Sequence, residues 1–206
     1  DLTPAKRFLL RNDFNVNNNN KVSFRYNHLD SSTDVSVSSS GSLGRGRGTF
    51  SPTFLSFQNS NYQILENIRS GIGEWNAIIG DNIPNSLIGG YTYQDESRAS
   101  RGTFFPFVDI LEGSATYTSF GFEPFTPNNE LRYKTFQVQN NLTRYGANHG
   151  LTFGGSLERY ESENVFFPGS QSVYVYNSLQ DFYTDIDGFQ ANPNRTTSPV
   201  TLRRFQ

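Results

Sequence analysis

Hydrophobic and polar residues alternate with a period of two in the first thirty residues of the chain. Even positions from 8 to 16 are mostly apolar, whereas the odd positions between them are mostly charged or carry amides. This period is typical of a β-strand with one apolar face. Four asparagines at residues 17–20 favour a tight turn, and the alternation then resumes over residues 22–28. The pattern predicts an antiparallel hairpin over about residues 6–29.

Two further hairpins follow from the same reasoning. One covers about residues 62–95, with a turn at residues 80–85 that contains Gly, Asn and Pro. The other covers about residues 131–161, with a turn at residues 146–150, and its alternation is as clear as that of the first hairpin. Strands of roughly nine to eleven residues are expected in these hairpins.

Long connections separate the hairpins. Residues 30–53 are rich in Ser and Gly, and residues 96–129 contain several prolines and glycines. We expect a long loop in the first and an irregular excursion with at most short strands in the second. Beyond the third hairpin, the sequence predicts a short aromatic strand at residues 173–176 and one helical turn capped near Ser178.

Long strands joined alternately by short turns and long loops are typical of a transmembrane β-barrel. The predicted fold class is therefore all-β: an antiparallel meander of long hairpins, part of a transmembrane β-barrel, with long irregular loops. A soluble β-sandwich also alternates, and is the competing interpretation. Strand length favours the barrel, because soluble strands more often have five or six residues.

Composition fits this interpretation. Only 34% of the residues are hydrophobic, yet aromatics reach 15%. Half of each barrel strand faces water, which explains a low apolar fraction in a membrane protein. The 17 basic and 19 acidic residues nearly balance, so the chain lacks the basic field that binding to nucleic acid requires. Nucleic acid is therefore not an expected partner.

Candidate chemistry is sparse. The chain has no cysteine, which excludes disulfides, thiolate metal sites and a cysteine nucleophile. The two histidines, His28 and His149, have no catalytic or metal-binding spacing. We expect no enzyme, no metal site and no cofactor.

Ligand contacts are expected from arginines in the long connections and from tyrosines. Arginines could contact anionic groups, but exposed charges are also often only solvated. Tyrosines could stack on a flat ligand, or could form the interfacial girdle of a barrel. The candidates are Arg45, Arg47, Arg98, Arg101, Tyr91, Tyr93, Tyr174 and Tyr176.

A series of short motifs resembles a known family. The motifs are NIPNSLIGGYTYQDESR at residues 82–98, FP at 105–106, VDI at 108–110, EPF at 123–125, NNEL at 128–131, TFQVQNNL at 135–142, HGLTFG at 149–154, NVFFP at 164–168 and NSLQDF at 177–182. Their order over residues 6–201 resembles the barrel region of Oar-like TonB-dependent outer-membrane receptors.

The resemblance implies a transporter of Gram-negative bacteria with a 22-stranded barrel, a plug and a segment that contacts the TonB system. The chain has room for about six to eight strands at this strand length, so we expect residues 1–206 to be one barrel-derived segment of a longer protein. The absence of any Met and the start at Asp1 agree with a piece of a longer chain.

The expected function is that of the parent: movement of an unidentified bulky ligand across the bacterial outer membrane, with membrane lipid and the TonB system as partners. The open sheet edges of such a segment invite self-association. The alternative is a soluble or surface-attached β-rich module that binds a glycan or a protein.

Overall fold

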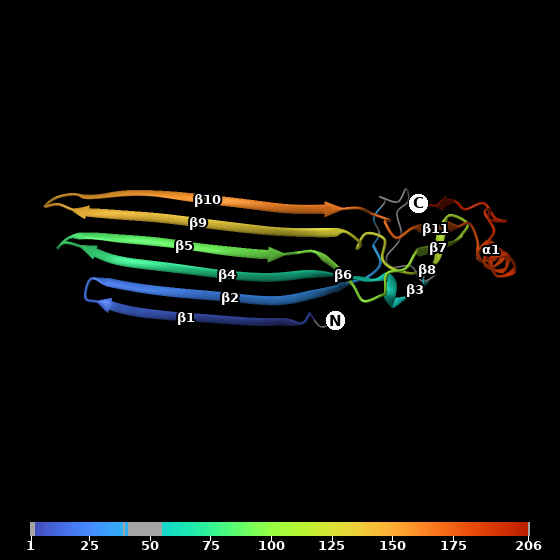
Figure 1. The fold of residues 1–206 in the computed structure, drawn as a ribbon, viewed down its shortest axis with the longest axis horizontal. Coiled ribbons are helices and arrows are strands. Elements are labelled where there is room, and N and C mark those ends of the chain that lie inside the picture. Colours follow the sequence, from blue (N-terminus) through green and yellow to red (C-terminus); the bar gives the residue numbers. More distant parts are fainter. Residues whose placement is uncertain (1–2, 39, 41–54, 206) are drawn as a thin grey trace.

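The computed structural model describes residues 3–38, 40 and 55–205. These residues form a long, thin sheet with a compact cap at one of its ends (Figure 1). The tight turns between strands lie at the opposite end from the cap. The chain thus has two structurally different regions, which we call the long sheet and the cap.

Three hairpins build the long sheet, at the places where the alternation predicts them. Their strands are β1 (Ala5–Asn17) and β2 (Asn20–Val35), β4 (Tyr62–Ile79) and β5 (Ile83–Asp95), and β9 (Asn129–Tyr145) and β10 (Gly150–Phe166). The strands have 13 to 18 residues, more than the nine to eleven predicted. Backbone pairing continues past the apolar segments because the hydrogen-bond ladder does not depend on side-chain polarity.

The strands follow one another across the sheet in the order β1-β2-β4-β5-β9-β10. Every neighbouring pair is antiparallel. A short strand, β6 (Arg98–Ser100), also pairs with β4. The predicted antiparallel meander is therefore confirmed. Within the described residues, β1 and β10 each have a partner on one side only.

The asparagine turn forms as predicted. The side-chain oxygen of Asn17 accepts a hydrogen bond from the backbone N–H of Asn19 at 2.9 Å and another from the side-chain amide of Asn20 at 2.9 Å. Such local side-chain bonds replace backbone partners that a two-residue turn leaves unpaired. The second turn uses Gly80, whose φ of 62° is accessible to glycine without strain.

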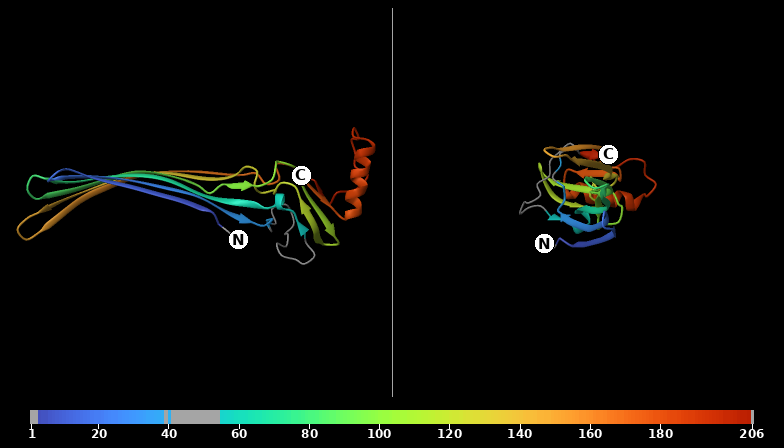
Figure 2. Two further views of the ribbon diagram at one scale, coloured as in Figure 1. Left: turned by 90° about the horizontal axis from the view of Figure 1, so that it is seen from below. Right: turned by 90° about the vertical axis from the view of Figure 1, so that its left-hand side faces the viewer.

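The cap is assembled from the two long connections and from the segment that follows β10. It contains β3 (Leu55–Ser56), the 3-10 helix η1 (Gln58–Ser60), β7 (Phe107–Glu112), β8 (Ala115–Phe120), β11 (Val173–Tyr176), α1 (Leu179–Ala191) and β12 (Arg204–Phe205). Its sheet has the order β12-β11-β7-β8-β3, with parallel pairing between β11 and β7 and between β3 and β8. Helix α1 stands upright at the far end (Figure 2).

The connection between β5 and β9 contains only short strands, as predicted, and two of them, β7 and β8, pair with each other. The expectation for the segment after the third hairpin needs correction. The single helical turn expected after Ser178 is in fact the 13-residue helix α1. Ser178 caps this helix as predicted, since its side chain accepts from the N–H of Asp181 at 3.0 Å. Packing of Leu179 and Phe182 against the cap sheet extends the helix beyond its first turn.

Nearly all buried apolar side chains lie in the cap. One cluster comprises Val37, Phe107, Leu111, Phe125, Val173 and Val175. A second comprises Val108, Ile110 and Tyr176, against which residues of α1 pack. In the described part of the long sheet, only Tyr62 and Ala77 are apolar and buried. The long sheet therefore has no core of its own.

No helix in the described ranges is long and apolar enough to cross a membrane.

Candidate functional site: the two faces of the long sheet

The strand register gathers the apolar positions of all six long strands on one face of the sheet. For example, Phe14 lies opposite Val22, Val22 opposite Trp75, and Trp75 opposite Leu87. We call this set the apolar band. Its members are Leu10, Phe14, Val22, Phe24, Tyr26, Trp75, Leu87, Tyr91, Phe136, Val138, Leu142, Phe153 and Leu157.

No other part of the described chain covers the apolar band. Phe14 is 59% exposed, Phe153 66% and Leu157 65%. The cap sheet lies beyond the end of the long sheet and not over its face (Figure 2). A soluble β-sandwich would bury this face under a second sheet. An exposed apolar surface of this extent marks contact with a partner or a membrane.

The apolar band ends toward the cap in a polar row on the same face. Here His28 Nε2 lies 2.9 Å from Asp30 Oδ2, and the guanidinium of Arg69 also pairs with Asp30. Lys134 and Glu161 lie opposite each other in the same part of β9 and β10. Charged side chains are tolerated at the edge of a lipid-facing band but are costly at its middle. This row therefore marks the boundary of the band.

The opposite face of the sheet is mostly polar, although aliphatic side chains such as Leu29, Ile68 and Ile88 also lie on it. On β1, β2 and β4 it carries ion pairs: Arg11 Nε lies 2.8 Å from Asp13 Oδ2, and Arg25 Nη2 lies 3.5 Å from Glu74 Oε2. On β5, β9 and β10 it carries amides and hydroxyls. The members there include Ser86, Thr92, Thr135, Gln137, Gln139, Asn141, Thr143, Thr152 and Ser156. This face suits a wet lumen.

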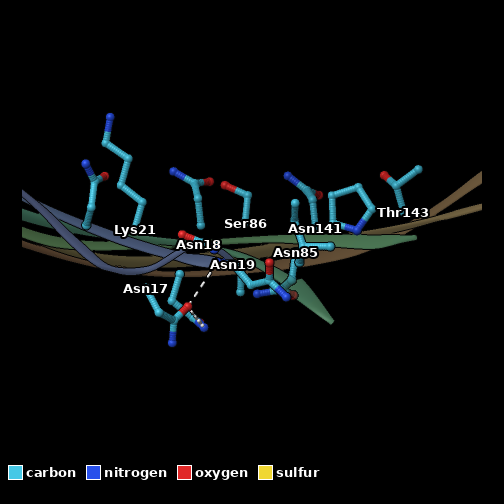
Figure 3. Close-up of a pocket in the computed structure, with 14 residues that line it drawn as sticks. Asn17, Asn18, Asn19, Lys21, Asn85, Ser86, Asn141 and Thr143 are labelled. Carbon is cyan, nitrogen blue, oxygen red and sulfur yellow. Dashed lines mark hydrogen bonds between the residues drawn. The ribbon is translucent and has the colours of Figure 1, made fainter. Parts of the chain in front are cut away.

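A shallow groove lies near the tight turns. Most of its lining residues are polar, and asparagines predominate. In Figure 3, Lys21, Ser86, Asn141 and Thr143 project to one side of the ribbon. Asn17, whose oxygen holds the turn, lies on the other side. The groove is open and hydrophilic, which suits the water-exposed rim of a barrel wall.

The arginines predicted as ligand contacts have separate environments. Arg45 and Arg47 lie outside the described residues. The guanidinium carbon of Arg98 lies 4.4 Å from the ring centroid of Tyr62, a cation–π distance. Arg101 Nη2 donates to Asp34 Oδ2 at 2.6 Å and thereby joins the segment after β6 to the end of β2.

The predicted tyrosines also separate into two places. Tyr91 and Tyr93 lie on the apolar face of β5, where Tyr91 is 47% exposed. Tyr174 and Tyr176 belong to β11 in the cap, and Tyr176 is buried. The structure does not bring the eight predicted residues together into one site. Ligand contact by any of them stays a prediction.

Tyr176 belongs to a buried polar cluster that holds α1 on the cap. Its hydroxyl donates to Asp185 Oδ2 at 2.7 Å, and Arg195 Nη2 donates to Asp185 Oδ1 at 2.6 Å. Burial, together with the Asp185 carboxylate, raises the pKa of the Tyr176 hydroxyl. Burial alone would raise the pKa of Asp185, but hydrogen bonds from Ser198, Tyr176 and Arg195 hold this pKa below its usual value. Asp185 is thus kept ionised.

Sequence reasoning missed an aromatic groove in the cap, whose lining includes Phe57, Phe120 and Phe182. These residues come from two connections and from the segment after β10, so no local pattern could have indicated them. The described residues contain no group of three or more His, Asp or Glu side chains placed to hold a metal ion.

Comparison with known proteins agrees with the two-faced sheet. A family model described as an outer membrane beta barrel domain matches residues 2–202. Structures of this kind are generally non-catalytic. No curated protein and no solved structure matches the chain. The chain lies in the bacterial outer membrane, and it belongs to the outer membrane beta barrel domain family.

Proposed function

We propose that this chain forms part of the wall of a TonB-dependent outer-membrane receptor of the Oar-like type, which moves a bulky ligand across the membrane. The observation that carries the proposal is the exposed apolar band opposite a mostly polar face. In a barrel the band faces lipid and the polar wall faces the lumen. The series of motifs from residue 82 to residue 182 supports the specific receptor type.

The proposal also orients the chain. Outer-membrane barrels have short turns on the periplasmic side and long loops on the outside. The asparagine groove would then lie at the periplasmic rim, and the cap would lie outside the cell. A cap with its own buried core, built on top of the barrel wall, suits a receptor that captures a ligand before transport.

The six long strands are too few for a transporter barrel of about 22 strands. We therefore propose that residues 1–206 are one barrel-derived segment and that further strands pair with β1 and β10. Backbone N–H and C=O groups at an open edge invite such pairing. Without those strands, the isolated chain would associate with other copies through the same edges.

Copurification tests the receptor type. The full natural gene product, solubilised from outer membranes, should be retained by the immobilised periplasmic domain of TonB. A barrel of the same size without a TonB-contacting segment serves as the control. If the gene product passes through like the control, the TonB-dependent part of the proposal is wrong and only the barrel assignment stands.

Light scattering tests the edges. The isolated 206-residue chain in detergent should elute as oligomers, because both edges are open. Proline substitutions at alternate edge positions of β1 should reduce the oligomer, since proline cannot donate a backbone hydrogen bond. A strict monomer of the unmodified chain would contradict edge-mediated association.

A further inference from the structure

The cap contains an aromatic groove that the barrel wall does not explain. It is formed by β3 and η1, by β7 and β8, and by the start of α1, so that both long connections and the segment after β10 contribute. Its lining consists of Leu55, Phe57, Gln58, Asn59, Ile110, Tyr117, Thr118, Phe120, Leu179, Phe182 and Tyr183. The elements that form it, β3, β7, β8 and α1, lie beyond the ends of the long strands, at the far end from the turns (Figure 1). The groove shares no lining residue with the apolar band.

The inner wall of the groove is fixed by ring contacts. Phe57 meets Phe120 edge-to-face at a centroid distance of 6.4 Å, and Phe120 meets Phe182 edge-to-face at 5.7 Å. Phe182 in turn packs edge-to-face on the buried ring of Tyr176 at 5.3 Å. This chain of rings connects the groove to the cap core. The wall is therefore preformed and does not need a ligand to assemble it.

The rim of the groove presents exposed rings to solvent. Phe57 is 50% exposed, Tyr117 43% and Tyr183 52%. Three exposed aromatic side chains around one depression form a surface that gains free energy when a flat apolar group covers it. The volume, about 910 Å³, falls within the range of small-molecule pockets.

Charge determines what the groove can bind. None of its eleven lining residues, all of which the structure describes, is charged. The side chains of Gln58 and Asn59 and the two tyrosine hydroxyls are the polar groups at its edge, while the hydroxyl of Thr118 is already bonded to the carbonyl of Leu55 at 2.8 Å. A charged ligand would lose water here without gaining a partner of opposite charge.

From these observations we infer that the cap groove is a binding site for an uncharged ligand that carries an aromatic or aliphatic ring. The ring lies against Phe57, Phe120 and Tyr117, and a polar substituent reaches the amides of η1. This inference goes beyond transport, because the site would exist whether or not the protein engages TonB.

Fluorine NMR tests the site with three matched probes. These are 4-fluorobenzyl alcohol, which is neutral, and the 4-fluorobenzoate and 4-fluorobenzylammonium ions, which carry the same ring with a negative or a positive charge. The full chain is placed in lipid nanodiscs, and empty nanodiscs correct for partition into lipid. The fluorine resonance of the neutral probe should broaden when the protein is added. Either ion should bind at least about tenfold more weakly, because its charge has no partner in the groove.

Two variants locate the binding. The double substitution Tyr117→Ser and Tyr183→Ser removes exposed rings without disturbing the core, and should weaken binding of the neutral probe at least about fivefold. Phe104→Ser is the matched control, because Phe104 is a 62% exposed aromatic outside the groove, and it should leave binding unchanged. Equal broadening by wild type and the double variant, or equal binding of the ions, would overturn the inference. A sedimentation experiment in which the wild type is a dimer and the double variant is a monomer would also overturn the inference, since a second copy would then occupy the groove.

Discussion

The long sheet and the cap differ in what covers their apolar side chains. In the cap, aromatic and aliphatic side chains are buried against one another, and Phe107 and Phe125 have at most 1% of their surface exposed. In the long sheet, comparable side chains such as Phe153 and Leu157 are about two-thirds exposed. In water, apolar side chains that remain this exposed would contribute little to the stability of the folded state. The difference indicates that lipid covers the apolar face of the long sheet, whereas the cap buries its apolar side chains in its own core.

Removal of a buried ring from the cap should have the largest effect. Phe107→Ala leaves a cavity in the first cap cluster and should cost about 3–5 kcal/mol of cap stability. Phe153→Ala is the matched change in the long sheet and should cost far less when lipid is absent, since that ring is already exposed. Hydrogen exchange in lipid-free detergent measures both, with the amides of β7 and β11 for the first variant and those of β9 and β10 for the second. Equal losses would break the distinction between the two regions.

A charge on the apolar band should have the next largest effect. Val138→Arg places a guanidinium on the lipid side of the central strand β9 and should cost about 2–4 kcal/mol in vesicles. Its neighbour Gln139 points to the polar face, so Gln139→Arg should be nearly neutral. Urea unfolding from vesicles distinguishes the two. If both substitutions are tolerated equally, the apolar band does not contact lipid.

An alanine in place of a glycine should destabilise the cap by about 1–3 kcal/mol more than it destabilises the long sheet. Gly121 in the cap has a φ of 96°, and a Cβ there would lie 2.1 Å from the carbonyl oxygen of Pro106. Gly121→Ala should therefore destabilise the cap. Gly155 in β10 has no atom within 4 Å of its Cβ position, so Gly155→Ala should be tolerated. Thermal unfolding of the two variants gives the comparison. A Gly121→Ala protein as stable as the wild type would contradict the close approach of the backbone at Gly121 to Pro106.

The smallest expected effect is the pH dependence of the cap. The folded state holds the pKa of Asp185 below its usual value near 3.8. This carboxylate therefore contributes stability at neutral pH, and the contribution is lost as the pH falls below about 4 and through the folded pKa.

Asp185→Asn should reduce this loss of stability at low pH, which we call the acid limb, when it is measured by hydrogen exchange of the α1 amides. Asp187→Asn, an exposed position on the same helix, is the control and should keep the limb. An unchanged acid limb in Asp185→Asn would show that the buried cluster does not govern cap stability.

Alternation allowed the three hairpins to be predicted, because a period of two is a local property that each strand carries in its own residues. The asparagine turn was predictable for the same reason, since Asn17 bonds to residues only two and three positions away. Strand ends were less predictable. The ladder continues beyond the apolar positions wherever a neighbouring strand offers backbone partners, as between Val35 and Tyr62.

The candidate ligand contacts were much less predictable. Tyr176 looked like other tyrosines in the sequence, but it is buried in the second cap cluster, where its hydroxyl donates to Asp185. Likewise Arg98 is held over Tyr62, a residue 36 positions away. Contacts of this kind depend on which connections meet in space, which no local pattern contains.

Long two-faced strands follow from the order of residues alone, because side-chain alternation and turn residues act over a few neighbouring positions. The assembly of the two long connections and the segment after β10 into a cap, with its own core and an uncharged aromatic groove, depends on the tertiary structure. Those features arise from packing between residues more than a hundred positions apart, such as Val37 and Val175 in the first cap cluster. The free energy of that packing depends on shape and burial, which exist only once the chain has folded.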